Sequence, residues 1–362
     1  MNLGIIGLGE VAQMMHLPVL SDMWDVCRIT AVSDISTELV EHIKARYGIP
    51  YGTTDAYKLI RREDVDAVLV LCPDQYHGPY VKSAIEIGKH VFVEKPAALS
   101  IKELSALIEV HGKNPDIIVM VGYMRRYASN FLLASEMLKS GGRKTEYLRF
   151  RDIILEAEYY RGQSRNTFVP KDIPQKTIIE SRLQRINCLN LALGQKATEV
   201  ERTVYQKLTG LGCHSLSAVR ELFGIPRKVV SVTASEDGTH LVITFEFDGF
   251  IAIYELVNDQ KVVQFDASVE IFQKNRKILI KYDTPYIRNL PLNLQVIDST
   301  PKDTKTTVFG PIYTDPFRTE MELFLESIRT GVQPKTSLED SLEDLRLFQM
   351  IMKRYRREKC SK

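Results

Sequence analysis

The sequence predicts an α/β protein in two parts: a doubly wound parallel sheet, followed by an α+β domain with a large, mostly antiparallel open sheet. Over the first third of the chain, short apolar runs alternate with stretches of helical periodicity. Such alternation with short links is typical of parallel strands joined by right-handed crossover helices. A glycine-rich turn follows the first apolar run. In the second half, strand-like runs follow one another directly, which is typical of antiparallel pairing.

Length and composition limit what the protein can be. The 362 residues are enough for two domains, and a net charge of +2 gives no field that would steer nucleic acid or an anionic membrane. No run approaches the ~18 apolar residues of a membrane span. The five cysteines are scattered and never spaced C-x-x-C, so we expect a reduced, cytoplasmic protein without disulfides or a metal site.

The parallel part is expected to contain strands that are buried on both faces, because its apolar runs are continuous. Gly48 is a plausible C-cap, Pro79 and Gly88 mark the two ends of a helix, and Ser100 with Glu103 forms a capping box. These signals predict strands at 3–8, 29–33, 67–72, 91–93 and 117–121, and helices at 10–20, 37–47, 79–87 and 100–112.

The pattern changes near residues 122–128, and we place the domains at 1–124 and 125–362. Asp248-Gly249 is a two-residue hairpin signal within the second domain. Residues 156–210 are polar and helix-leaning and look like an insertion. The remaining patterns predict helices at 129–139, 214–223, 316–330 and 338–356, and strands at 146–155, 228–234, 240–247, 250–257, 261–271 and 276–281.

The glycine turn is the strongest local motif. It reads Gly7-Leu8-Gly9-Glu10-Val11-Ala12, directly after a buried strand and at the start of a helix. The first glycine permits a tight turn, the second removes a side chain that would block a pyrophosphate, and the alanine allows close packing of helix and strand. The helix N-terminus offers free N–H groups to the phosphates. In this context the motif predicts a dinucleotide-binding Rossmann domain.

Asp34 ends the second predicted strand, 22 residues beyond Ala12. An acid at this place accepts hydrogen bonds from the adenosine ribose and repels a 2′-phosphate. This favours NAD over NADP. A role for Asp34 as a turn or N-cap residue before the next helix is compatible with both cofactors.

A further strand ends in Glu94-Lys95-Pro96, at the carboxyl edge of the sheet where ligands bind. The residue before a proline is held extended, so Lys95 is expected to project from a rigid strand end toward the nicotinamide. Elsewhere in a protein such a lysine would be an exposed turn residue.

Taken together, these residues resemble the Gfo/Idh/MocA oxidoreductases, named for glucose-fructose oxidoreductase and inositol dehydrogenase. The combination is far more specific than any one motif, and it spans about residues 1–225. The matching pieces are the turn at 7–12, Cys72-Pro73 with His77, Gly88-Lys89-His90, Glu94-Lys95-Pro96, the run Gly122-Tyr123-Met124-Arg125-Arg126-Tyr127, and Gly212-Cys213-His214.

The resemblance implies the roles of several side chains. Lys95 contacts both nicotinamide and substrate, Cys72-Pro73 lines the dinucleotide, and the Arg125-Arg126 segment crosses into the second domain near the site. It thereby implies cofactor contacts for Gly7, Gly9, Glu10, Val11, Ala12, Asp34, Cys72, Pro73, His77, Glu94, Lys95 and Arg126, and substrate contacts for Lys95, Tyr123, Arg125, Arg126 and His214.

His214 is the second expected catalytic residue beside Lys95. Many family members have Asp-x-Gly-x-His here, but this sequence has Gly210 at the aspartate position. Gly212 and His214 therefore match, while the usual carboxylate partner does not. A histidine suits proton transfer near neutral pH. Without the motif, His214 would be interpreted as a helix N-terminal histidine satisfied by a neighbour.

The resemblance implies a hydride transfer between NAD(P) and a secondary alcohol or ketone of a sugar, sugar derivative or cyclic polyol. Within the insertion, Tyr160 is a candidate substrate contact, although the pattern taken alone favours a surface residue of a helical insert. Two alternatives stay open: a dinucleotide-binding regulator without catalysis, and a dehydrogenase of an imine or trans-diol. The resemblance also implies a homodimer or homotetramer formed through the C-terminal sheet, with no nucleic-acid or membrane partner.

Overall fold

The computed structural model describes residues 1–154, 158–164, 167–258 and 265–360. The chain divides into two compact units, each made of several segments. The first unit comprises Met1–Gly122, Arg165–Ala197 and Glu320–Leu345, and the second comprises Tyr123–Ser164, Thr198–Thr319 and Arg346–Lys362.

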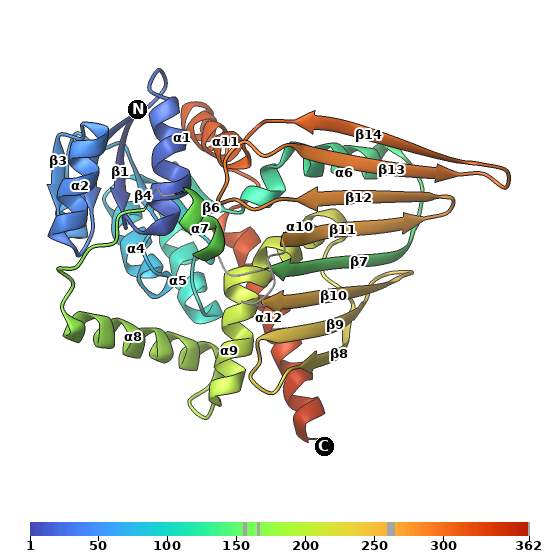
Figure 1. Cartoon of the computed structure of the whole chain (residues 1–362). Coiled ribbons are helices and arrows are strands. Elements are labelled where there is room, and N and C mark those ends of the chain that lie inside the picture. Colours follow the sequence, from blue (N-terminus) through green and yellow to red (C-terminus); the bar gives the residue numbers. More distant parts are fainter. Residues whose placement is uncertain (155–157, 165–166, 259–264, 361–362) are drawn as a thin grey trace. The chain divides into compact units, whose positions relative to one another are not determined.

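The first unit is built on a six-stranded sheet in which every pairing is parallel. Its spatial order is β3-β2-β1-β4-β5-β6, so the direction of winding reverses between β1 and β4 (Figure 1). In such sheets, ligands bind at the carboxyl ends of the strands beside this reversal. The strands are β1 (Asn2–Ile6), β2 (Arg28–Ser33), β3 (Tyr51–Thr53), β4 (Ala67–Val70), β5 (His90–Glu94) and β6 (Val119–Gly122).

The helices of the first unit begin and end where local signals require. Ser36 accepts a hydrogen bond from the Leu39 N–H, and Gly48 ends the same helix with a φ of 65°. Ser100 likewise accepts from the Glu103 N–H. The helices are η1 (Ala12–His16, a π-helix), α1 (Leu17–Asp22), α2 (Thr37–Tyr47), α3 (Ala56–Ile60), η2 (Asp74–Tyr76), α4 (His77–Glu86), α5 (Ile101–Gly112) and α8 (Gln175–Leu193), with most of α11 (Pro316–Thr330) and the beginning of α12 (Leu338–Cys360).

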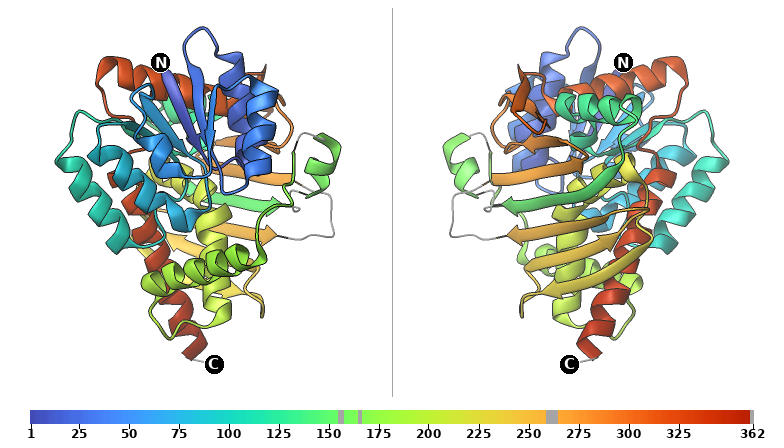
Figure 2. Two further views of the ribbon diagram at one scale, coloured as in Figure 1. Left: turned by 90° about the vertical axis from the view of Figure 1, so that its left-hand side faces the viewer. Right: turned by 90° about the vertical axis from the view of Figure 1, so that its right-hand side faces the viewer.

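The second unit is built on an eight-stranded sheet in the order β14-β13-β12-β11-β7-β10-β9-β8. Only the β7–β10 pairing is parallel, and the strands form one layer in the right-hand view of Figure 2. The strands are β7 (Thr145–Ile154), β8 (Lys228–Ala234), β9 (His240–Glu246), β10 (Ile251–Asn258), β11 (Phe265–Gln273), β12 (Arg276–Tyr282), β13 (Leu292–Ser299) and β14 (Thr304–Ile312). The helices are η3 (Met124–Tyr127), α6 (Ser129–Ser140), α7 (Glu158–Ser164), α9 (Glu199–Lys207), η4 (Leu208–Gly212, a π-helix) and α10 (Cys213–Phe223).

One face of this sheet forms a core with its helices, because alternate residues of the central strands β7 and β10 are buried. Phe150 on β7 stacks on Tyr254 of β10 with ring centroids 4.6 Å apart. Asn130 on α6 donates to the carbonyl oxygen of Lys281 at 2.7 Å, which fixes that helix on the same face.

The predicted fold class is confirmed, and most predicted elements lie within a few residues of their observed positions. The hairpin at Asp248-Gly249 joins β9 to β10, and Gly249 has the expected positive φ of 89°. Residues 261–264 of the strand expected at 261–271 lie outside the described residues. The short elements β3 and α3 and the strands β13 and β14 were not predicted.

The missed strands β13 and β14 have a physical reason. β13 does alternate, with Leu292, Leu294 and Val296 buried, but the prolines on its N-terminal side interrupt the pattern. β14 is an edge strand whose residues are mostly exposed, so it has no apolar alternation to detect. Within the parts of the chain that the structure describes, no helix has the length and apolar character needed to cross a membrane.

Candidate functional site

The glycine turn lies at the carboxyl end of β1, next to the point where the strand order reverses. Gly7 has a φ of 90°, and a β-carbon there would stand 2.5 Å from the backbone nitrogen of Cys72. Gly9 differs, since a β-carbon there would meet no other part of the described chain within 4 Å. The fold therefore requires a glycine at position 7, whereas the space next to Gly9 is open to a bound ligand.

Exchanging each glycine for alanine separates these two roles. Gly7→Ala is expected to destabilise the protein by roughly 2–5 kcal/mol, from left-handed strain and overpacking. Gly9→Ala is expected to change stability by less than about 0.5 kcal/mol and to weaken NADH binding about tenfold, equivalent to ~1.4 kcal/mol. Urea unfolding and fluorescence titration with NADH measure the two effects. Normal NADH affinity in the Gly9→Ala variant would contradict the assignment of this turn.

Asp34 follows β2 directly, and its carboxylate is held in place by backbone donors. One oxygen accepts from the Leu8 N–H of the glycine turn at 2.8 Å, and the other accepts from the Ser36 N–H at 3.0 Å. Burial raises the pKa of Asp34 above its ordinary value, and the nearby negative charge of Asp172 adds to the rise. Each oxygen keeps a lone pair with which it can accept a hydrogen bond from a ribose hydroxyl.

His77 connects the ends of two central strands. Its Nε2 lies 2.7 Å from the carbonyl oxygen of Cys72, after β4, and its Nδ1 lies 2.8 Å from that of Pro96, after β5. A neutral imidazole has a single N–H and donates to one of these oxygens at a time. Pro73 follows Cys72 and begins η2, and burial raises the pKa of the Cys72 thiol to about 12. The thiol is thus protonated and unreactive at neutral pH.

Glu94 and Lys95 stand at the carboxyl end of β5, and the Lys95-Pro96 peptide bond is cis. Glu94 forms a 2.8 Å pair with the fully buried His16 of the π-helix η1. Burial alone would raise the pKa of Glu94, but the hydrogen bond from His16 and the charge of Lys95 hold it below its ordinary value. The sequence did not point to His16, because the partnership depends on β5 lying next to the first helix.

Part of the predicted insertion packs against the first unit. Gln13 accepts from the Phe168 N–H at 2.7 Å and donates to the Phe168 carbonyl oxygen at 3.1 Å. Further along, Arg185 on α8 pairs with Asp74 at 2.8 Å. These contacts keep the segment beside the glycine turn and the end of β4.

In the second unit, Arg125 is engaged in a buried network. It donates to the carboxylate of Asp152 at 2.5 Å and to the hydroxyl of Ser215 on α10 at 2.8 Å. The Tyr254 hydroxyl donates to the other oxygen of Asp152 at 2.7 Å. Burial would lower the pKa of Arg125, but the charge of Asp152 raises it. This network joins η3, β7, β10 and the first turn of α10.

The other predicted residues of the second unit lie on or next to η3, α10 and α7. Arg126 pairs with Glu221 of α10 at 2.5 Å, and its guanidinium lies 5.6 Å from the ring centroid of buried Tyr123. His214 is half-buried in the first turn of α10, directly after the π-helix η4. Tyr160 on α7 is 9% exposed and stacks parallel to Tyr286 at 6.3 Å. His214 and Tyr160 thus belong to different elements of the same unit.

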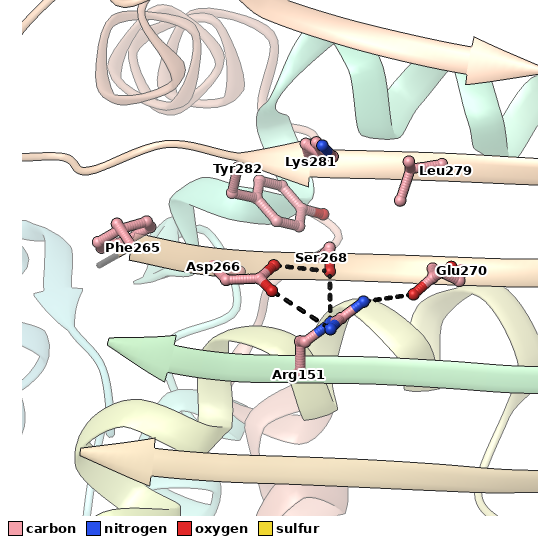
Figure 3. Close-up of a pocket in the computed structure, with 9 residues that line it drawn as sticks. Arg151, Phe265, Asp266, Ser268, Glu270, Leu279, Lys281 and Tyr282 are labelled. Atoms are coloured by element: carbon pink, nitrogen blue, oxygen red, sulfur yellow. Dashed lines mark hydrogen bonds and ion pairs between the residues drawn. The ribbon is translucent and has the colours of Figure 1, made fainter. Parts of the chain in front are cut away.

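A pocket of about 390 Å³ lies on the opposite face of the eight-stranded sheet, lined by β7, β11 and β12 (Figure 3). At the centre of the pocket, Arg151 donates to Ser268 and Glu270 and pairs with Asp266 (Figure 3). The positive charge of Arg151 is therefore neutralised by neighbouring carboxylates. None of the residues assigned to cofactor or substrate lines this pocket.

The residues present fit a dinucleotide. At Gly9 a β-carbon would meet nothing of the described chain within 4 Å, so the backbone is open to a ligand there, and the first helix begins directly beyond it. The carboxylate of Asp34 is fixed by donors on two sides. Both features lie at the reversal point of the parallel sheet, where such ligands bind.

Comparison with known proteins agrees with this geometry. Residues 1–123 match the Gfo/Idh/MocA model, described as an oxidoreductase family with an NAD-binding Rossmann fold. A myo-inositol 2-dehydrogenase of Thermotoga maritima is 33% identical over 141 residues, 39% of this chain. The match spans only 41% of that relative's length. An uncharacterized oxidoreductase of Bacillus subtilis, YrbE, is 24% identical over 94% of this chain and 90% of its own length.

A solved structure has the same fold over its full length. KijD10, a 3-ketoreductase from Actinomadura kijaniata in complex with NADP and TDP-benzene, superimposes with a TM-score of 0.73. The alignment covers 98% of this chain and 97% of that chain at 17% identity.

Proposed function

We propose that this chain, whose residues 1–123 match the Gfo/Idh/MocA family of oxidoreductases, is an NAD(P)-dependent dehydrogenase or reductase of a secondary alcohol or ketone in a sugar, sugar derivative or cyclic polyol. The observation that carries the proposal is the turn at Gly7 and Gly9, beside the held carboxylate of Asp34. The inositol dehydrogenases among the relatives support the substrate class.

The first unit would hold the cofactor. The backbone from Gly7 to Ala12 would bind the phosphates, and Asp34 would bind the adenosine ribose. Cys72, Pro73, His77, Glu94 and Arg126 are proposed to line the remainder of the dinucleotide. The nicotinamide, when bound, supplies or accepts the hydride.

Two side chains of the chain would act on the substrate. Lys95 would hydrogen-bond the reacting oxygen and stabilise its developing negative charge. His214 would take the hydroxyl proton in oxidation and return it in reduction. Tyr123, Arg125 and Tyr160 stay proposed substrate contacts, and Arg125 and Tyr123 would act mainly by shaping the site, because both are buried.

A substrate panel tests the function. Inositols, aldoses, sugar acids, trans-diols and cyclic imines are offered with NAD or NADH, and the NADH absorbance band reports turnover. We expect saturable turnover on polyols or sugars, abolished when enzyme or substrate is omitted. Cofactor binding without turnover on any compound would instead support a dinucleotide-binding regulator, an outcome that Gly210 in place of the family aspartate makes worth testing. Turnover confined to diols or imines would change the substrate class.

We also propose that the chain forms a homodimer or homotetramer through the open face of the eight-stranded sheet. Apolar side chains on its strands are exposed, with Val242 at 47%, Ile251 at 51% and Val308 at 55%. Light scattering coupled to gel filtration is expected to show an oligomer that Ile251→Glu weakens. A monomer at micromolar concentration would contradict this proposal.

A further inference from the structure

The sequence segment just before α8 crosses the adenosine side of the proposed cofactor site. Phe168 donates one hydrogen bond to the Gln13 side chain and accepts another from it, and its ring stacks on His42 of α2 with centroids 4.3 Å apart. The next residues therefore run along the N-terminus of α2, immediately beyond Asp34.

Asp172 occupies that helix N-terminus. One of its oxygens accepts from the Ser36 hydroxyl, and the other accepts from the Glu38 N–H at 3.0 Å. The Lys171 N–H donates to the Glu38 carboxylate at 2.9 Å, which fixes the backbone beside it. The hydrogen bond from Ser36 lowers the pKa of Asp172, so this carboxylate is ionised at neutral pH.

These hydrogen bonds occupy backbone N–H groups at the N-terminus of α2 that a phosphate would otherwise bind. Free N–H groups at a helix N-terminus are favourable for phosphate. Here the Ser36 N–H is taken by Asp34, the Leu39 N–H by the Ser36 hydroxyl, and the Glu38 N–H by Asp172. Ser36 itself is fully buried, so its hydroxyl is held in this network.

The two carboxylates also act together by charge. Asp172 contributes to the raised pKa of Asp34, after the larger effect of burial, so the two groups are close enough to repel each other. The 2′-phosphate of NADP binds at the end of the second strand, where an acid selects against it. Such a phosphate would meet two carboxylates, and the N–H groups of Ser36, Glu38 and Leu39 already have acceptors.

We propose that Asp172 is a specificity-determining residue that, together with Asp34, excludes the 2′-phosphorylated dinucleotide and makes the chain selective for NAD. The proposal rests on the proposed function, since it assumes that a dinucleotide binds along the glycine turn. Lys171 brings a cation nearby, and solvent screens the charges of both Lys171 and Asp172 because both side chains are exposed. The Asp172 carboxylate, however, is held at the N-terminus of α2 by its hydrogen bonds to Ser36 and Glu38.

Equilibrium binding tests the assignment without relying on turnover. Dissociation constants for NADH and NADPH are measured by fluorescence titration for the wild type, Asp172→Asn, Asp172→Ala and Asp55→Asn. Asp55 caps α3 in the same unit through the Tyr57 and Lys58 N–H groups, so its variant controls for loss of a capping acid. We expect both Asp172 variants to bind NADPH about tenfold more tightly relative to NADH, and the Asp55 variant to keep the wild-type ratio.

Ionic strength gives a second test, the first part of which uses the wild type alone. In the wild type, the preference for NADH over NADPH should shrink as salt is raised, because salt screens the two carboxylates, and it should shrink less in Asp172→Asn. An unchanged NADPH-to-NADH ratio in both Asp172 variants would overturn this assignment alone. A wild-type chain that binds neither dinucleotide would overturn the proposed function and the assignment with it.

Discussion

Replacing Lys95 with alanine is expected to lower kcat by roughly 10²–10³-fold, because the reacting oxygen loses the donor that stabilises its negative charge. Lys95 follows the last residue of β5, and its backbone N–H donates to Glu94, whose side chain pairs with His16. The backbone that carries the amine is thus tied to the Glu94–His16 pair. Steady-state kinetics with the best compound of the substrate panel measures the loss.

The control for this experiment is Lys82→Ala on α4, where the lysine is 55% exposed and pairs loosely with Glu86 at 3.8 Å. That variant should keep its kcat. NADH binding to Lys95→Ala should stay within a fewfold of the wild type, which separates a catalytic effect from loss of cofactor. A Lys95→Ala enzyme that turns over at the wild-type rate would refute the role of this residue.

Replacing Asp152 with alanine is expected to destabilise the protein by about 3–5 kcal/mol, since it leaves the charge of Arg125 buried without its partner. The side chains of Asp152 and Arg125 are 0% and 3% exposed, and Tyr254 also loses its acceptor. Arg125 further donates to Ser215 in the first turn of α10. Loss of this network should therefore disturb the start of the helix that carries His214. Urea unfolding followed by circular dichroism measures the stability.

A second ion pair provides the matched comparison. Glu326 and Arg329 pair at the surface, with side chains 48% and 71% exposed, so Glu326→Ala should leave the unfolding midpoint unchanged. The double variant Arg125→Met with Asp152→Leu should recover much of the lost stability, because neither charge is then buried alone. If Asp152→Ala unfolds at the wild-type urea concentration, the network has no structural role.

The fold and much of the first unit could be predicted because their signals are local. The apolar runs of β1 and β4 are buried on both faces, and Ser36, Gly48 and Ser100 act on their own helices. The positive φ of Gly7 likewise follows from a turn that only a few residues define. Patterns of this kind depend on the backbone period and on steric limits, which any neighbouring structure must respect.

The partners of the site residues could not be predicted, because they come from distant parts of the sequence. His16 meets Glu94, and Arg125 meets Asp152 and Ser215, only after the strands have taken their order in the sheets. The sequence suggested Arg125 as a substrate contact, while the structure shows it in a buried network. That contact therefore stays a proposal, supported by the resemblance alone.

Local patterns were sufficient for the dinucleotide fold, for the turn that would hold the phosphates and for the acid at Asp34. The tertiary structure decided which other groups surround that acid. The segment that contains Asp172 follows β7 in sequence but belongs to the first unit. This brings the Asp172 carboxylate to the N-terminus of α2, the helix that follows Asp34. The reason is physical: a hydrogen bond or a charge interaction depends on distance in space, and only packing of the chain determines which side chains are brought within that distance.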